Sequence, residues 1–474
     1  MDKKAFLEFS ENALNNSIIP NLSTFIRIPN TSPLFDKEWD TNNYLLNAAT
    51  HLYSYASSLQ LKEASINLYK DTNHTPLIYI KISSNIPNNK KSILFYGHFD
   101  KQPANVGWDK NKGATIPVIE NNRLFGRGAA DDGYSIFAAL NSIKLCQNFN
   151  LKYPEIYIII EGSEESTDLE LHYYFDKLLN ENKIPSNLSL FVCLDNGCLD
   201  YERLWMTSSL RGYAGLDVKI QTLTKDLKDN KNYSGIVPDN FFIVKEILNN
   251  IQDNNTGEIL IDECKIPEEK IPENRMNEMK RVANILKDTF TKDFPLYEDT
   301  RPLSEDVYTL ILNKGWKPSM NLCGIDGINN ERFSNKLNKE IYLNLSMRLP
   351  PLIDSKKAVE AISQKILEKK YFNCNIETSN FDYSDGWNLI NFSERIRNIL
   401  NNASKIFFDN EIEFLAEGGS IPFVNYLQVT LIDTEIVCTG VCGIDSNEHG
   451  PNESINLIAL KKFICCLAYL ISEF

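Results

Sequence analysis

The sequence contains no long apolar run, and this absence bears on where the protein works. No stretch of about 18 apolar residues occurs in the 474-residue chain, so we expect no transmembrane helix and no membrane partner. The first residues, MDKKAFLEFSENALNN, lack the apolar core of a secretory signal peptide. The most apolar segment, 455–470, includes Lys461 and Lys462 and has an amphipathic helical pattern. We therefore expect a cytoplasmic protein.

Basic residues are scarce relative to acidic ones. Lysine and arginine number 49 against 63 aspartates and glutamates, which gives a net charge of −14. A chain this acidic is repelled by nucleic acid and by anionic membrane surfaces, so nucleic acid is not an expected partner. The acidity suits a protein that gathers carboxylates around metal ions, although a role in solubility alone would also explain it.

The ten cysteines lack the paired framework of a small secreted domain. Cys465 and Cys466 are adjacent, and Cys438 and Cys442 lie four residues apart, but no second pair stands at zinc-finger spacing. Because a chain of this length can build a sufficient core without disulfides, the sequence indicates reduced, buried thiols.

The length also exceeds what one hydrophobic core comfortably supports, so we expect two domains. Residues 1–211 alternate helix and strand patterns, with the buried-strand runs SILFY (92–96), IYIII (156–160) and LSLFVCL (188–194). Such alternation predicts an α/β domain whose mainly parallel sheet is covered by helices.

The pattern changes after residue 211. Segments 215–220 and 341–349 alternate apolar and polar residues, as half-solvated strands do, and 355–369 has a helical period. These patterns predict a smaller α+β domain over 212–385, inserted into a larger domain formed by 1–211 and 386–474. Within the last segment, we expect 428–432 to form a buried strand.

Five segments carry metal-binding side chains, mostly just after buried-strand patterns, where ligands of open parallel sheets gather. In YGHFD, His98 offers an imidazole, and Asp100, two residues on, points to the same side and can fix its tautomer. In FGRGAADDGYS, a carboxylate before a helix pattern could bridge two cations. Alternatively, His98 is structural, and Asp131 or Asp132 is a helix N-cap.

The segment EGSEES sets two acids side by side after a strand pattern. Neighbouring carboxylates in low-dielectric surroundings repel one another unless a cation or proton lies between them. A metal on Glu165 would leave Glu164 free to take a proton from the attacking water, whereas a solvated loop is the simpler alternative. Asp195 in CLDNG and His449 in EHGPNE are weaker signals of the same kind.

Together these segments supply imidazole and carboxylate ligands without thiolate. That ligand set suits two divalent ions in an open catalytic site, with Zn²⁺ favoured and Mn²⁺ or Co²⁺ as alternatives. Two ions about 3.5–4 Å apart that share one carboxylate form a hydrolytic pair.

The motifs YGHFD, GRGAADD, EGSEES, CLDNG, EGGSIP (417–422) and HGPNE stand in the order and at the spacings of a known family. Over nearly its whole length the chain resembles the zinc metallopeptidase family of carnosinase, carboxypeptidase G and succinyl-diaminopimelate desuccinylase, a group of aminoacylase-like di-zinc hydrolases. The resemblance implies one metal site formed by His98, Asp131 and Asp195. It implies a second formed by Asp131, Glu165 and His449, with Asp131 shared.

The resemblance also implies roles for residues outside the metal sites. Glu164 stands at the position of the general base, and Asp100 at that of the acid behind a ligand. Asp195, rather than a glutamate, is similar to the aminopeptidase and dipeptidase branch. Arg348, in LSMRLPP, matches an arginine of the lid domain that holds a substrate carboxylate. A loop that contacts the substrate backbone is matched by Gly418, Gly419 and Ser420.

One departure from the family concerns a histidine of the lid domain that supports the oxyanion in the partner subunit's active site. In this chain KDLKDNKNYSGIVP stands in its place, with Asp229 or Tyr233 at the position according to the alignment. No histidine lies between His172 and His449. Tyr233 is the candidate donor, and the alternative is that it only packs on the surface of the lid. The resemblance further implies that 212–385 is a lid that carries a homodimer contact.

We therefore expect a hydrolase that cleaves the peptide or amide bond of dipeptides or short peptides. Water activated by two zinc ions would be the nucleophile, with Glu164 as general base. One alternative is a deacylase of N-acyl amino acids that uses the same metals. Another is a weakly active or inactive binding protein, because the lid histidine is missing.

Overall fold

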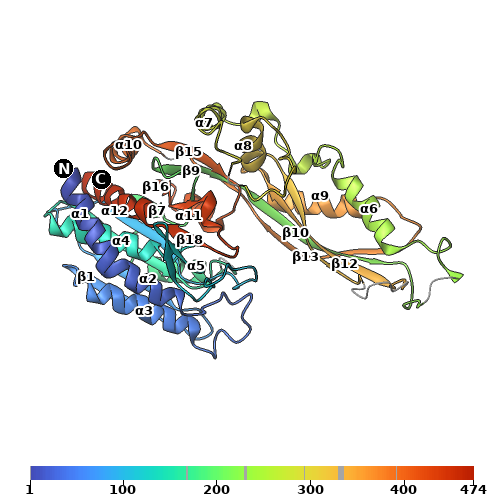
Figure 1. The fold of residues 1–474 in the computed structure, drawn as a ribbon, viewed down its shortest axis with the longest axis horizontal. Helices are drawn as coiled ribbons and strands as arrows, with labels where there is room; N and C mark the ends of the chain where they lie inside the picture. The colour runs from blue at the N-terminus through green and yellow to red at the C-terminus, as the bar shows by residue number, and fades with distance from the viewer. Residues whose placement is uncertain (1, 167–168, 229–231, 293, 329–335, 391) are drawn as a thin grey trace. The chain divides into compact units, whose positions relative to one another are not determined.

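The computed structural model describes residues 2–166, 169–228, 232–292, 294–328, 336–390 and 392–474 (Figure 1). The chain divides into two compact units. The first comprises Met1–Thr207, Leu389–Leu415 and Tyr426–Phe474, and the second Ser208–Asn388 and Ala416–Asn425. The short segment Ala416–Asn425, which we expected in the larger domain, thus belongs to the second unit.

The largest sheet of the described chain has nine strands, in the order β1-β2-β6-β3-β7-β16-β9-β14, with β15 also paired to β9. Its centre is parallel and consists of β6 (Glu155–Glu161), β3 (Ser92–His98), β7 (Leu190–Cys193) and β16 (Glu435–Cys438). Its flanks include β1 (Ala64–Tyr69), β2 (Leu77–Ile82), β9 (Trp205–Leu210), β14 (Trp387–Asn388) and β15 (Glu413–Glu417). Every residue of β3 and β7 is buried, as expected for parallel strands covered on both faces.

Helices cover this sheet. Helix α4 packs on β3 and β6 and also on α12, which contacts α1 and α10. Helix α3 packs on β1 and β2. The Tyr174 ring of α5 lies 6.4 Å from the Tyr69 ring of β1. A π-helical segment, Leu14–Ile18, precedes α2, and Pro20 lies in the first turn of α2. These helices are α1 (Lys3–Ala13), α2 (Ile19–Ile26), α3 (Tyr44–Ser58), α4 (Ser135–Asn148), α5 (Leu169–Asn180), α10 (Glu394–Phe408) and α12 (Leu457–Glu473).

Two small sheets accompany the large one. The first has the order β18-β5-β4, from β18 (Ser454–Asn456), β5 (Arg123–Phe125) and β4 (Val118–Glu120). The second pairs β8 (Gly197–Cys198) with β17 (Cys442–Gly443). Short 3₁₀ turns occur at Asp262–Cys264, Glu268–Lys270 and Ile444–Ser446.

The start of α4 approaches β3 so closely that Gly97 cannot be replaced freely. A Cβ atom at Gly97 would lie 2.2 Å from the Ser135 hydroxyl oxygen and 2.5 Å from a carboxylate oxygen of Asp132. Glycine at this position therefore allows the loop before α4 to reach the end of β3.

The second unit contains a four-stranded antiparallel sheet in the order β11-β12-β10-β13. Alternate residues of β10 and β12 are buried, as the alternating sequence predicts. The buried side chains of these strands pack with those of α6 and α9. The elements are β10 (Gly212–Gln221), β11 (Ser319–Asp326), β12 (Glu340–Leu349), β13 (Asn375–Ser384), α6 (Asn240–Ile251), α7 (Glu273–Ile285), α8 (Val307–Trp316) and α9 (Ser355–Leu367).

One expected element is wrong. Residues 428–432 do not form a strand, because α11 (Pro422–Thr430) extends into them. Leu431 is buried, but Val429 and Ile432 are 74% and 69% exposed, so the apolar run is not buried as a whole. Periodicity alone does not distinguish a short apolar run in a strand from one in a helix. The buried strand of this region is β16, a few residues further on.

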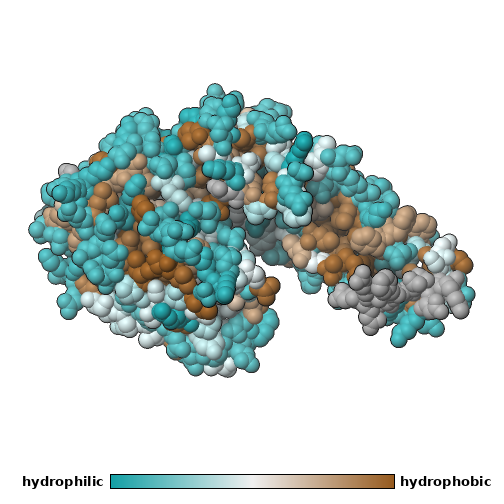
Figure 2. Space-filling view, viewed as in Figure 1, coloured by the Kyte–Doolittle hydropathy of each residue, from teal (hydrophilic) through white to brown (hydrophobic). Residues whose placement is uncertain are grey.

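The fold class is confirmed: an α/β unit with a parallel-centred sheet covered by helices, and an inserted smaller α+β unit. Hydrophilic side chains cover much of the visible face of each unit (Figure 2). Among the described residues, no helix has the length and apolar character that crossing a membrane would require.

Candidate metal centre

The parallel strands carry their polar residues to one edge of the sheet. His98 ends β3, the pair Glu164 and Glu165 follows β6, and Asp195 follows β7. Because β6, β3 and β7 are parallel neighbours, their carboxyl ends lie together. Loops before α4 and before β18 add Asp131 and His449, which lie close to the strand-end residues.

Asp131 lies between the two histidines. One carboxylate oxygen, Oδ1, is 3.1 Å from His98 Nε2, and the other, Oδ2, is 2.8 Å from His449 Nε2. His449 Nε2 is also 3.3 Å from Glu165 Oε1. His98 Nε2 also lies 3.9 Å from Asp195 Oδ2 and 4.0 Å from Glu164 Oε2. The structure thus gathers all six of these residues, and Asp131 presents a different oxygen to each imidazole.

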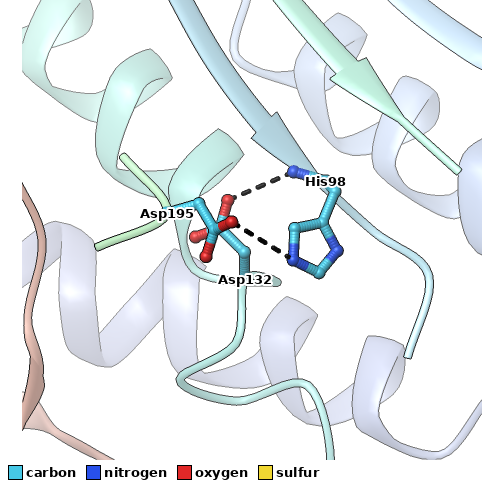
Figure 3. A group of neighbouring side chains, drawn as sticks. All are labelled: His98, Asp132 and Asp195. Atoms are coloured by element: carbon cyan, nitrogen blue, oxygen red, sulfur yellow. Dashed lines mark hydrogen bonds and ion pairs between the residues drawn. The ribbon is translucent and has the colours of Figure 1, made fainter. Parts of the chain in front are cut away.

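His98 belongs to two groups of potential ligands. One comprises His98, Asp131 and Glu165, and the other His98, Asp132 and Asp195 (Figure 3). Asp132 Oδ2 accepts a hydrogen bond of 3.1 Å from the main-chain amide of His98, while Oδ1 is buried without a hydrogen-bond partner among the described residues. Asp132 is therefore a potential ligand, although the resemblance assigned only Asp131 of this pair to the metal sites.

Neither aspartate of this pair caps α4. The residue before the helix is Tyr134, which makes no side-chain capping bond. Asp132 contributes its main-chain carbonyl to the Ser135 amide, while its carboxylate points to His98. The N-cap alternative for Asp131 and Asp132 is thus wrong, since both carboxylates contact histidine groups instead.

Asp100 connects the end of β3 to the acidic pair. Its two carboxylate oxygens accept hydrogen bonds of 3.1 Å from the main-chain amides of Glu164 and Glu165. Its Oδ1 is 3.4 Å from His98 Nδ1, and its main-chain carbonyl oxygen is 3.1 Å from the same nitrogen. Asp100 can therefore fix the imidazole, as expected, and it also holds the acidic loop. Gln102, which sequence reasoning missed, donates a 2.6 Å hydrogen bond to Glu165 Oε2.

Two residues assigned to substrate binding, Arg348 and Ser420, are hydrogen-bonded to each other within the second unit. Arg348 of β12 stands opposite Tyr213 of β10 and donates a 3.0 Å hydrogen bond to the Ser420 hydroxyl. The Ser420 hydroxyl donates to the main-chain oxygen of Arg211. The guanidinium of Arg211 in turn donates to the main-chain oxygens of Gly418 and Lys317. Sequence reasoning missed Arg211, although it stands directly before β10.

Arg348 also borders a hollow of about 320 Å³ in the same unit. A Cβ atom at Gly419 would meet nothing within 4 Å, so the backbone there is open to a ligand. Tyr233 is 43% exposed, and Asp229 lies outside the described residues. The hollow is lined by Tyr213, Gly215, Leu216, Cys323, Asn344, Leu345, Ser346, Arg348, Asn380 and Asp382.

A model of the Peptidase family M20/M25/M40 matches residues 94–473. The chain belongs to this family. The match spans all the expected metal ligands, and the resemblance drawn from the six motifs is confirmed.

Known proteins are similar in sequence to this chain over most of its length. Similar proteins include Cys-Gly metallodipeptidase DUG1 of Saccharomyces cerevisiae, 24% identical over 397 residues, with 78% of this chain and 76% of the relative covered. Another is Beta-Ala-His dipeptidase of Homo sapiens, 23% identical over 390 residues, with 80% and 74% covered.

Solved structures share the fold of this M20-family chain. The Saccharomyces cerevisiae di-peptidase Dug1p superposes with a TM-score of 0.81 at 20% identity and covers 100% of this chain and 98% of its own. Human carnosine dipeptidase 1 has a TM-score of 0.79 at 18% identity, with 99% and 98% covered.

Burial and mutual repulsion raise the pKa values of three acids of the centre. Burial raises the pKa of Glu165, and the neighbouring Asp131 carboxylate raises it further, to about 8, although His449 lowers it. Burial likewise raises the pKa of Asp195 to about 7, against the lowering effect of His98. Burial and the charge of Asp195 raise the pKa of Glu164 well above its usual range.

The imidazoles respond in a complementary way. The His449 side chain is 54% exposed, so desolvation lowers its pKa only in part, and its hydrogen bonds to Asp131 and Glu165 outweigh this effect and raise the pKa to about 11. The hydrogen bonds from His449 and His98 hold the Asp131 pKa well below its usual range, although burial acts in the other direction. The cluster therefore needs positive charge, from protons or from cations.

These residues fit divalent metal ions. The donors are imidazole nitrogens and carboxylate oxygens, the acids repel one another, and one acid oxygen of Asp132 is buried without a hydrogen-bond partner among the described residues. A cation would stabilise the charged form of each acid where burial now opposes it. The M20-family fold and this donor set together support a metal-dependent enzyme.

We predict that the chelated protein loses stability as the pH rises from about 5.5 to about 8.5. The folded-state pKa values of Glu165 and Asp195 lie above those of unfolded carboxyls, which are about 4. The folded state therefore holds extra protons between about pH 4 and pH 8, and the stability they contribute is lost as pH rises through that window. Melting temperatures of chelated protein across this range test the sign.

The metal-loaded protein is the control for this prediction. Its ligands are already deprotonated, so its melting temperature should vary less over the same range. A melting temperature of the chelated protein that holds level or rises toward pH 8.5 would contradict the assignment of these two acids.

Proposed function

We propose that the protein is a dipeptidase that hydrolyses the peptide bond of short peptides with two divalent metal ions, Zn²⁺ in the simplest case. The observation that carries this proposal is the division of the Asp131 oxygens, one toward His98 and the other toward His449. A carboxylate in this position can bridge two cations. Support also comes from relatives that are named as dipeptidases.

In this proposal His98, Asp131 and Asp195 would hold one ion, and Asp131, Glu165 and His449 would hold the other. Bound cations of this kind polarise a scissile carbonyl and make water a stronger acid. Asp131 would be the shared ligand. Asp132 accepts a hydrogen bond from the His98 amide and so orients the end of β3.

Glu164 is the proposed general base. Its Oε2 lies 4.0 Å from His98 Nε2, the same nitrogen that lies 3.9 Å from Asp195 Oδ2. Asp100 holds its main-chain amide, so the side chain remains available to the attacking water. Burial raises the pKa of Glu164, which makes its carboxylate a better proton acceptor. The same carboxyl can then give the proton to the leaving amine.

Arg348 is the proposed partner of the substrate's terminal carboxylate, with Gly418, Gly419 and Ser420 beside it. An arginine guanidinium can hold a carboxylate with two parallel hydrogen bonds. Only one guanidinium nitrogen of Arg348 is used on Ser420. The adjoining hollow offers space for the side chain of a small substrate.

Other parts of the proposal concern the second unit and the protein's surroundings. We propose that 212–385 forms a lid that carries a homodimer contact, and that the Tyr233 hydroxyl replaces the missing lid histidine as oxyanion donor. Tyr233 is exposed enough to serve a partner. A cytoplasmic location is supported by the ten cysteines, all of which are free thiols.

We predict that the chelated protein is inactive and folded, and that Zn²⁺, Mn²⁺ or Co²⁺ restores hydrolysis of a dipeptide panel. The sheet core does not depend on metal, so circular dichroism should change little on chelation, unlike that of a zinc finger. The panel should include N-acetyl amino acids. Turnover of these alone would establish the deacylase alternative, and no turnover of any compound with metal bound would indicate a binding protein.

Glu164→Gln is expected to keep both metals and lose turnover by about 10²–10⁴-fold, because an amide cannot accept the proton of water. Elemental analysis and kcat should be measured on the same preparation. The neighbouring variant Glu165→Gln is the contrast, since it should lose metal. A metal-loaded Glu164→Gln enzyme with the parent's kcat would remove Glu164 from the mechanism.

Arg348→Met should raise KM for dipeptides with a free carboxylate by about 10–100-fold, since hydrogen bonds to charged groups contribute about 1.5–3 kcal/mol. C-terminally amidated dipeptides should be affected far less. Arg301→Met, whose side chain is 82% exposed in the same unit, is the matched control. Equal losses on the free and amidated substrates would rule out Arg348 as the carboxylate partner.

A further inference from the structure

The small sheet β18-β5-β4 brings two ligand-bearing loops together. Ser454 of β18 pairs with Phe125 of β5, so the loop that follows β5 lies against the loop that precedes β18. The first of these loops leads to Asp131, and the second contains His449. The amide of Gly126 donates a 2.9 Å hydrogen bond to the main-chain oxygen of Glu453, which continues the contact beyond the strands.

One buried ion pair connects these loops. Arg127 Nη1 lies 2.7 Å from Glu453 Oε2, and the two side chains are 3% and 0% exposed. The other oxygen of Glu453 accepts hydrogen bonds from the main-chain amides of Ala130, at 3.1 Å, and Asp131, at 3.3 Å. Arg127 Nη2 donates to the main-chain oxygen of His449, at 3.0 Å. A single pair thus holds the backbone of both Asp131 and His449.

The remaining ligands are held by other means. His98 is the last residue of β3, and its amide is bound by Asp132. The backbone before Asp195 is tied to β3 by a hydrogen bond from the Leu194 amide to the Tyr96 carbonyl. Glu165 is positioned by the hydrogen bond that its main-chain amide donates to the Asp100 carboxylate. Loss of the ion pair would therefore disturb Asp131 and His449 first.

We propose that Arg127 and Glu453 are positioning residues that set the protein's affinity for the ion held by Asp131, Glu165 and His449. This inference rests on the proposed two-metal function. Both Asp131 and His449 serve that ion, whereas the other ion shares only Asp131 with it. Loss of the pair should therefore lower the affinity for this ion more than the affinity for the other.

The chemistry of the pair supports this role. Two buried charges cost desolvation free energy, so a buried ion pair is weak evidence for stability alone. Here each charged group also bonds to the backbone of a ligand-bearing loop, with a geometry that apolar side chains could not provide. Partners that orient metal ligands typically change metal affinity by about 10–100-fold when they are replaced.

The test is a calorimetric titration of the chelated protein with Zn²⁺. The parent should bind two ions. Glu453→Gln should bind one ion with the parent's affinity and the second about 10–100-fold more weakly, because an amide nitrogen would face the Arg127 guanidinium. Arg127→Lys should act in the same direction, since an ammonium cannot hold Glu453 and the His449 carbonyl in one planar fork.

Glu278→Gln is the matched control. Arg275 and Glu278 form a second buried pair, with Nη1 and Oε2 2.7 Å apart and exposures of 4% and 5%, within α7 of the second unit. Its loss should cost stability without changing either metal affinity.

The outcomes separate the two proposals. A parent that binds fewer than two ions would refute the two-metal function itself. With two ions bound by the parent, unchanged affinities in folded Glu453→Gln or Arg127→Lys would overturn the positioning role. An equal loss of affinity for both Zn²⁺ ions would also overturn it, as would the same change of affinity in Glu278→Gln. Failure of both Arg127→Lys and Glu453→Gln to fold with metal present would make the pair structural instead.

Discussion

Repulsion among buried carboxylates is the constraint on which this centre depends. Asp131, Glu164, Glu165 and Asp195 lie within a few ångströms of His98 and His449, at an edge of the sheet where burial opposes every negative charge. Such an arrangement is unfavourable unless positive charge compensates it. The imidazoles compensate part of it, and divalent cations would compensate the rest. The fold must therefore hold the acids in place, because the acids would not gather on their own.

Hydrogen bonds from main-chain amides keep several of these acids in place. Asp100 accepts the amides of Glu164 and Glu165, and Asp132 accepts the amide of His98. Acids of the same chemical type thus take different roles according to what they contact. Those bound to amides orient neighbouring loops, whereas Asp131 faces two imidazoles and suits a shared ligand.

The second unit includes a short segment, Ala416–Asn425, that the sequence pattern had placed in the larger domain. Ala416–Asn425 is far from β12 in sequence, yet Ser420 accepts a hydrogen bond from Arg348 and donates one to Arg211. Its hydroxyl is therefore engaged in orienting an arginine. The backbone at Gly419 is open by contrast, since a Cβ atom there would meet nothing within 4 Å.

The sequence by itself indicated the fold class, three of the four parallel strands and the ligand-type residues at their ends: His98, Glu164, Glu165 and Asp195. Those features depend on local patterns: continuous apolar runs for buried strands, and ligand-type residues directly after them. Local patterns failed at 428–432, where a short apolar run suits a helix as well as a strand. Only the tertiary structure decided that Asp132 binds the His98 amide rather than capping α4, and that Arg127 and Glu453 connect two loops. Glu453 lies more than 300 residues from Arg127, and a contact at that separation depends on the pairing of β5 with β18, which no local sequence pattern specifies.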